Sequence, residues 1–436
     1  MDNRSREILR RKLTRLARRG LLRDKKILLF GASFFSREVK NCLSELGFAI
    51  DGVIDNDSRK IGIACMGMRV QRPEDALLPY DDGFVVLILS GGFYREMTRQ
   101  LRLMGYSENR HVFVLNFKID ESPPVMAYAA ARTIRGNAAY RKLMQGMPEK
   151  SVLFIAPYTG TGDIYLIGLF FREYLRRNGI SEYVFVVVSG ACKKVAEMFG
   201  IWNIVVVKPA VADDMIHCRC FLREDWPVVV LNDGWLGEPS QWLRGYKGLH
   251  FEKVFRRFVF GFDDSVPFAL PPKMDCREET DALFLKHGLK KGETVVLSPY
   301  SNTLFDLPGD LWRRIVEHCK GLGYAVCTNC AGASEKAIAG TEAVFFPLSL
   351  AKAFLDAAGY FIGVRSGLCD IISASSCKKI VLYEKDGFFY KCSSYAYFGL
   401  ARMGLCGDAT EIEYRDDIRE GVFKEIKDAL RPREVN

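Results

Sequence analysis

Residues 151–177 constrain the fold of this 436-residue chain more than any other segment. Residues 151–157 have the continuous apolar character of a buried strand, a loop with two glycines follows, and residues 164–177 continue as a long apolar helix. A strand that leads into a helix in this way is typical of a parallel α/β sheet. It places Asp163 at the carboxyl edge of that sheet, where such folds bind ligands, so Asp163 is a candidate general base. The alternative is that Asp163 only caps the helix, and this segment alone leaves both interpretations open.

The same alternation of strands and helices recurs along two blocks of the chain. In the first block we expect strands at 151–157, 183–189, 203–208 and 227–232, with helices at 164–177, 191–199 and 211–222. In the second block we expect strands at 294–299, 324–328, 343–346, 360–364 and 379–383, with helices at 309–321, 333–339, 350–357 and 368–376. An amphipathic helix at 415–430 follows. The pattern predicts an α/β protein with one parallel sheet in residues 151–272 and another in residues 273–436.

A second strand–turn–helix unit lies in the second block, where the apolar run 360–364 leads into Arg365, Ser366, Gly367 and Asp370. Together with the Gly162-Asp163 pair, this turn resembles the pattern of glycosyltransferase family 9, the heptosyltransferase-like family. In that family the first half opens with a strand and a Gly-Asp pair, and the second half carries a Gly-Val-Asp-Thr-Gly-Leu-type turn before a helix. The passage into Ser301, Asn302 and Thr303 looks like the family's Pro-Gly-(Ser/Thr) loop. The resemblance spans residues 150–430.

The resemblance implies a GT-B fold, in which two Rossmann-like parallel-sheet domains face one another. It implies an acceptor domain at 151–272, a nucleotide-sugar domain at 273–436, and inverting transfer to a cell-surface polysaccharide or lipid-linked glycan without a metal or cofactor. Asp163 would be the general base, and the acceptor loop would consist of Thr159, Gly160, Thr161 and Gly162. The implied donor-binding residues are Ser301, Asn302, Thr303, Glu335, Arg365, Ser366, Gly367 and Asp370. Arg365 suits a diphosphate because guanidinium binds phosphate in a bidentate way, although an ion pair at the rim would also account for it.

The chain departs from the family pattern at three places. Arg365 stands where the family has Asp, and Asp370 stands where it has His. A family lysine near the first loop of the nucleotide domain has no counterpart at 305–308. These departures leave the donor sugar unspecified. Two other functions stay open, namely polysaccharide pyruvyl transfer, to which Val364-Arg365-Ser366 has a loose likeness, and a non-catalytic nucleotide-sugar-binding scaffold of capsule assembly.

Residues 26–120 indicate a further Rossmann-like domain ahead of the transferase core. A strand runs into Gly31 and Ser33, and the next strand ends at Asp55, as in dinucleotide-binding units. This segment resembles the small domains found beside sugar-modifying and capsule-biosynthesis enzymes. Because serines replace the second and third glycines of the phosphate loop, an accessory role is favoured over a nucleotide site formed by Gly31, Ser33 and Asp55. Residues 121–150, with a basic helical stretch, are interpreted as a helical linker.

The positive charge of the chain is concentrated at its start. Residues 1–26 hold eleven Lys and Arg against three acids, a net of +8 out of +9 for the whole chain. Leucines recur among these arginines at helical spacing, which predicts a basic amphipathic helix over residues 1–25. Such a helix either lies on an anionic membrane or packs its apolar stripe against the next domain, whereas nothing following it indicates a nucleic-acid partner.

The cysteine content and the apolar runs of the sequence indicate the cell compartment of the protein. Thirteen cysteines are scattered without the spacing of a disulfide framework or a zinc site, which predicts reduced thiols and no metal centre. No apolar run is long enough to span a bilayer, and the start of the chain lacks the apolar core of a secretory signal. We therefore expect a cytoplasmic protein, peripheral to the inner face of the membrane if the basic helix binds lipid.

Overall fold

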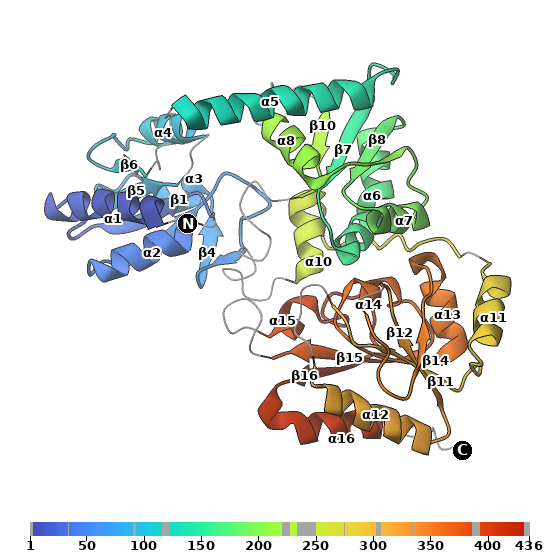
Figure 1. Cartoon of the computed structure of the whole chain (residues 1–436). Coiled ribbons are helices and arrows are strands. Elements are labelled where there is room, and N and C mark those ends of the chain that lie inside the picture. Colours follow the sequence, from blue (N-terminus) through green and yellow to red (C-terminus); the bar gives the residue numbers. More distant parts are fainter. Residues whose placement is uncertain are drawn as a thin grey trace. The chain divides into compact units, whose positions relative to one another are not determined.

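The computed structural model describes residues 3–33, 35–89, 93–115, 123–219, 227–232, 250–273, 275–301, 307–332, 335–385 and 393–430 (Figure 1). The chain divides into two compact units. Unit 1 comprises the described residues up to Ala130, and unit 2 comprises the described residues from Ala131 onward. No helix among the described residues is both long and apolar enough to cross a bilayer.

Unit 1 is built on a six-stranded sheet with the order β3-β4-β2-β1-β5-β6. Its strands are β1 (Lys26–Phe30), β2 (Gly52–Ile54), β3 (Ala64–Cys65), β4 (Met68–Gln71), β5 (Phe84–Ile88) and β6 (Val112–Val114), and only β3 pairs antiparallel. Its helices are α1 (Asn3–Arg18), α2 (Ser36–Glu45), α3 (Pro73–Leu77) and α4 (Tyr94–Leu103). Parallel β1, β2 and β5 with intervening helices confirm the Rossmann-like unit expected from residue 26 onward.

Helix α1 packs its apolar stripe against the sheet of unit 1. Leu9, Leu13 and Leu16 are buried in one cluster with side chains of β1 and β5, and Leu22 from the following turn joins them. Arg6 adds an ion pair to Glu38 of α2, with 3.0 Å between Nη2 and Oε1. Of the two alternatives for the basic helix, packing against the next domain is therefore the arrangement that the structure has.

Unit 2 contains two parallel sheets, each at the centre of one lobe. The first lobe has the order β10-β7-β8-β9, with strands β7 (Val152–Ala156), β8 (Tyr183–Val187), β9 (Ile204–Val206) and β10 (Val228–Val230). Its helices are α6 (Thr161–Asn178), α7 (Gly190–Met198) and α8 (Pro209–Arg219). Buried side chains of α6 and α7 cover one face of this sheet, and those of α8 cover the other (Figure 1). All four strands expected in this block are present.

The second lobe has a six-stranded parallel sheet with the order β13-β12-β11-β14-β15-β16. Its strands are β11 (Thr294–Ser298), β12 (Ala325–Asn329), β13 (Glu342–Val344), β14 (Gly359–Val364), β15 (Lys378–Glu384) and β16 (Thr410–Tyr414). Its helical segments are α11 (Arg277–Lys286), α12 (Gly309–Gly321), η3 (Leu348–Leu350), α13 (Ala351–Ala358), α14 (Gly367–Ile371), α15 (Ser394–Phe398), η4 (Asp416–Ile418) and α16 (Arg419–Leu430). The five expected strands are present, and β16 is an additional edge strand.

The closing helix α16 stays within the second lobe. Val422, Ile426 and Leu430 are buried in one cluster with Ile315 of α12 and Ile412 of β16. In GT-B proteins a closing helix often returns to the first lobe, but here α16 covers the sheet of its own lobe beside α12 (Figure 1).

The helix expected at 333–339 is wrong over the described residues 335–339, which contain no helix. Side chains of β12 and of the loop after β11 bind the backbone of this segment instead. The N–H of Ile338 donates to Oγ1 of Thr328 at 3.1 Å, and the hydroxyl of Tyr300 donates to the carbonyl of Lys336 at 2.6 Å. These bonds occupy groups that a helix would have paired internally.

Residues 250–273 connect the lobes and are anchored to α6 by aromatic contacts. They include α10 (Phe251–Lys253) and the π-helical turn η2 (Val254–Val259). The guanidinium of Arg256 lies 4.8 Å from the ring centre of Phe170 and 5.1 Å from that of Phe268, and it pairs with Glu252. The two rings also contact each other, with 5.7 Å between their centres. These cation–π contacts of a buried guanidinium fix this segment against the first lobe.

Helix α5 (Pro123–Met144) carries the chain into unit 2, and its second half packs on the first lobe. Arg132 and Arg135 both pair with Asp214 of α8, at 2.8 and 2.7 Å. Gly136 lies so close to α8 that a Cβ atom at this position would collide with the backbone carbonyl of Asp214. A glycine in the middle of a helix is thus explained by close helix–helix contact.

We predict that Gly136→Ala destabilises unit 2 by about 1–3 kcal/mol, because overpacking a tight contact costs this much. Gly321→Ala on α12 is the matched control, since a Cβ there meets no atom within 4 Å. The control should stay within about 1 kcal/mol of the parent chain, on the stabilising side. Thermal unfolding measures both, and equal melting temperatures for the two variants would contradict the proposed contact.

Candidate active site

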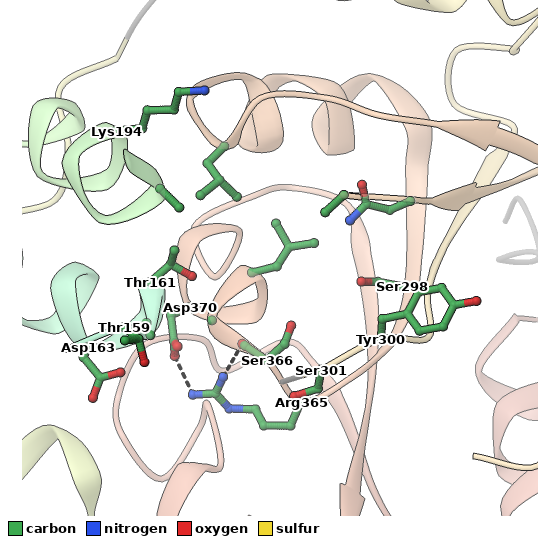
Figure 2. Close-up of a pocket in the computed structure, with 18 of the residues that line it drawn as sticks. Thr159, Thr161, Asp163, Lys194, Ser298, Tyr300, Ser301, Arg365, Ser366 and Asp370 are labelled. Carbon is green, nitrogen blue, oxygen red and sulfur yellow. Dashed lines mark hydrogen bonds and ion pairs between the residues drawn. The ribbon is translucent and has the colours of Figure 1, made fainter. Parts of the chain in front are cut away.

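A cavity of about 500 Å³ lies between the two lobes of unit 2 (Figure 2). The loops that follow β7, β11, β12, β13 and β14 all contribute to its lining. Each of these loops leaves the carboxyl end of a parallel strand, which is the edge at which α/β sheets bind ligands. The lining residues of the first lobe and the connecting segment are Thr159, Gly160, Thr161, Gly162, Asp163, Ala191, Lys194 and Phe251.

Most of the site residues predicted from the sequence line this one cavity. They are Thr159, Gly160, Thr161, Gly162 and Asp163 from the first lobe, and Ser301, Glu335, Arg365, Ser366, Gly367 and Asp370 from the second. Asn302 and Thr303 lie outside the described residues. The sequence reasoning missed Lys194, Tyr300, Phe345 and Phe398, which also line the cavity.

The lobes meet where the first turn of α6 approaches the first turn of α14. A Cβ atom on Gly162 would collide with Oδ2 of Asp370 and lie 3.1 Å from the Cα of Gly367. A Cβ atom on Gly367 would in turn lie 2.6 Å from the backbone nitrogen of Gly162. Both positions need glycine because a side chain on either would force the lobes apart at the floor of the cavity.

A buried ion pair supports this meeting point from the second lobe. Nη2 of Arg365 lies 2.6 Å from Oδ1 of Asp370, and both side chains are almost fully buried. Nε of Arg365 donates to the carbonyl of Phe398 at 2.9 Å, and Nη1 donates to the carbonyl of Ser366. Burial alone would lower the pKa of Arg365, but Asp370, with smaller contributions from Tyr383 and Cys369, outweighs burial, so the pKa is raised. Arg365 is thus charged, with three of its five N–H donors bound within its own lobe.

Asp163 is a partly buried carboxyl group at the first turn of α6, on the cavity wall. Its Oδ2 folds back over Gly160, where a Cβ atom would collide with it. Burial raises the pKa of Asp163 to about 7, the neighbouring Asp370 adds to the shift, and a backbone hydrogen bond and Arg365 oppose it. Figure 2 shows Asp163 and Thr159 on one side of Asp370, with Arg365 on the other. The N-cap position of α6 is Gly160, and no side chain makes a capping hydrogen bond there, so Asp163 is an acidic residue of the first turn and not the helix cap.

Lys194 is an exposed cation of the cavity that comes from α7 of the first lobe. Within the described part of the chain, no carboxylate pairs with it, whereas its neighbour Lys193 lies 3.7 Å from Glu197. Helix α7 packs against η3 of the second lobe, so Lys194 lies at the junction of the lobes. Figure 2 shows its side chain extending from α7 toward the second lobe.

The far part of the cavity lies in the second lobe and combines aromatic with polar groups. Phe345 follows β13 and is 53% exposed at the cavity wall. Glu335 accepts a hydrogen bond from the backbone N–H of Ala331 at 2.6 Å, which fixes its carboxylate beside the end of β12. An exposed ring and a fixed carboxylate in one pocket are suited to a ligand with an apolar face and hydroxyl groups.

The three residues considered for an accessory nucleotide site lie in unit 1 and not in this cavity. Asp55 is buried and paired with Lys60, with 3.0 Å between Oδ2 and Nζ. Its carboxylate also accepts from the backbone N–H groups of Ala32 and Asp57, both at 2.8 Å. Gly31 has a φ of +107°, which allows the tight turn after β1. The buried hydroxyl of Ser33 has no hydrogen-bond partner among the residues that the structure describes. The oxygens of Asp55 thus hold the loop together.

Among the described residues, no three or more His, Cys, Asp or Glu side chains are grouped so that they could hold a metal ion. This finding does not test the reaction, so the metal-free transfer expected from the sequence stays a prediction.

The architecture of unit 2, with two Rossmann-like parallel-sheet lobes and a cavity between their carboxyl edges, is that of the GT-B fold. No protein-family model matches the chain, and no curated protein matches it. Among solved structures, a glycosyl transferase family 9 protein from Veillonella parvula matches with 15% identity and a TM-score of 0.41, over 65% of this chain and 91% of that one.

Two further solved structures that resemble the chain come from E. coli. Heptosyltransferase WaaC with ADP matches with 12% identity and a TM-score of 0.40, over 64% of this chain and 99% of that one. ADP-heptose lps heptosyltransferase II also has 12% identity, with a TM-score of 0.42, over 64% of this chain and 98% of its own. These three structures are of a glycosyl transferase family 9 protein and of heptosyltransferases, the family whose sequence pattern the motifs of this chain resemble. The two lobes of unit 2 are defined by its own two parallel sheets.

The raised pKa of Asp163 predicts a specific pH dependence of stability for Asp163→Asn. Below about pH 3 the carboxyl is protonated in the folded and the unfolded chain, so the variant should match the parent there. Between pH 4 and 7 only the unfolded chain ionises Asp163, which lowers the stability of the parent as pH rises. Asparagine does not ionise, so the variant should melt at a higher temperature than the parent at pH 8. Melting curves from pH 4 to pH 8 with no such divergence would contradict a raised pKa.

Proposed function

We propose that this chain is a glycosyltransferase that moves a sugar from a nucleotide-sugar to a hydroxyl group of a cell-surface polysaccharide or lipid-linked glycan. The observation that carries this proposal is the position of Asp163. It is a carboxyl with a pKa of about 7 on the first-lobe wall of a cavity whose other wall is the ligand edge of a second parallel sheet. A base is most effective when its pKa lies near the working pH, and a site shared by two lobes can hold a donor on one side and an acceptor on the other.

The proposed reaction is a single displacement that inverts the anomeric carbon. The acceptor oxygen attacks this carbon while Asp163 takes the proton of the hydroxyl group. The bond from the carbon to the phosphate oxygen breaks, and the nucleoside diphosphate leaves with the bonding electrons. No metal is assigned a role, because the base is a side chain and the charge of the leaving group can be met by cations and N–H donors. The sequence resemblance to family 9 supports the same assignment.

The second lobe is the proposed donor side. Phe345, Glu335 and Ser301 line this part of the cavity and offer a ring face, a carboxylate and a hydroxyl to a nucleoside. Arg365 is charge-compensated by Asp370, so its two remaining N–H donors can orient a phosphate but add little net charge. Lys194 brings the uncompensated positive charge from the first lobe. In this proposal it takes the place of the family lysine that has no counterpart at 305–308.

Asp163→Asn should lower the turnover of sugar transfer by a factor of about 10²–10⁴, the range for loss of a general base, while donor binding is retained. The matched control is Asp213→Asn, an exposed residue on α8 outside the cavity, which should leave turnover unchanged. Calorimetry with the donor and an assay of released nucleoside diphosphate measure the two effects.

Full activity of Asp163→Asn would show that Asp163 is not the general base. Consumption of phosphoenolpyruvate without release of a nucleotide would favour pyruvyl transfer, and the absence of any turnover with retained nucleotide-sugar binding would favour a scaffold.

Lys194→Gln should weaken the binding of nucleoside diphosphates about tenfold, because a hydrogen bond to a charged group contributes about 1.5 kcal/mol or more. Binding of the uncharged nucleoside should stay the same, since the lysine is proposed to meet the phosphates. Lys193→Gln on the same helix is the control and should bind both ligands as the parent does. Titrations at one salt concentration measure these affinities, and equal losses for the two variants would refute the specific role.

A further inference from the structure

Burial of the leucine stripe leaves a row of arginines on the opposite side of α1. Arg11, Arg15 and Arg18 are spaced by four and three residues, so at 3.6 residues per turn they fall within an arc of about 60°. This arc lies opposite the buried leucines of the same helix. Arg19 and Arg23 follow in the next turns, and all five arginines are exposed. We call these five residues the arginine row.

The arginine row is largely unneutralised. Arg11 pairs with Glu7 one turn earlier on the helix. Within the part of the chain that the structure describes, no carboxylate pairs with Arg15, Arg18, Arg19 or Arg23. Since residues 1–26 hold a net +8 of the chain's +9, this surface stands out from a nearly neutral remainder. A concentrated positive face of this kind attracts polyanionic surfaces.

We propose that the arginine row binds the protein to the anionic phosphates of a lipid bilayer by charge, without inserting apolar side chains. Insertion requires a free apolar face, and the leucines of α1 are buried in unit 1. Single-stranded nucleic acid is disfavoured as the partner because α1 carries no aromatic side chain that could stack on a base. The choice of lipid also rests on the proposed function, since a lipid-linked glycan acceptor is presented at a bilayer surface.

The test measures partition of the full chain onto vesicles of phosphatidylcholine with and without phosphatidylglycerol. The chain should bind only the anionic vesicles, and added salt should release it, because exposed charges are screened. The variant R15Q/R18Q/R19Q should bind about 100-fold more weakly, since each cation near an anionic surface contributes about 1 kcal/mol. The matched control is K286Q/K290Q/K424Q, which removes three exposed cations of unit 2 and should bind as the parent does.

Three results would overturn this inference. They are equal binding to neutral and anionic vesicles, unchanged binding of R15Q/R18Q/R19Q, and preferential binding of the parent to duplex DNA or RNA over the anionic vesicles. Two further measurements separate this inference from the proposed transferase reaction. Asp163→Asn should bind vesicles as the parent does, and R15Q/R18Q/R19Q should retain transfer to a soluble acceptor. Loss of vesicle binding and loss of catalysis are therefore distinguishable.

Discussion

The close contact between the first turns of α6 and α14 is the constraint on which the rest of unit 2 depends. Gly162 and Gly367 let the two lobes touch at backbone distance, and Asp370, held by Arg365, fills the space beside them. One continuous cluster of buried apolar side chains runs from the first lobe into the second around this contact. The lobes are therefore packed together at the floor of the cavity, while the loops above the contact line it.

This contact also adds to the raised pKa of Asp163, of which burial is the largest cause. The carboxylate of Asp370 crosses to the first turn of α6, so a negative charge from one lobe lies near the candidate base on the other. Arg365 keeps Asp370 in place and offsets part of its charge.

Much of the architecture could be predicted from the sequence, because parallel strands buried on both faces are continuous apolar runs. The turns at Asp163 and Arg365 could also be placed at one edge, since both follow such runs. Strand β16 was missed because its sequence, Thr-Glu-Ile-Glu-Tyr, alternates with charges that a sheet edge tolerates. Lys194 could not be distinguished from Lys193 by spacing, because only the packing of α7 on the second lobe decides which one lines the cavity. Likewise, no pattern indicated that Thr328 binds the backbone at Ile338 and prevents a helix there.

The central claim is that both lobes contribute to one nucleotide-sugar site. Its most direct measurement is a calorimetric titration of the purified chain with a panel of nucleotide-sugars and nucleosides, repeated with Gly367→Ala, which should separate the lobes at their contact. We expect one nucleotide-sugar to bind the parent chain. Gly367→Ala should weaken this binding much more than it weakens binding of the corresponding nucleoside, because the nucleoside contacts the second lobe alone. If the parent and Gly367→Ala bound the nucleotide-sugar with the same affinity, and likewise the nucleoside, a site shared between the lobes would be contradicted.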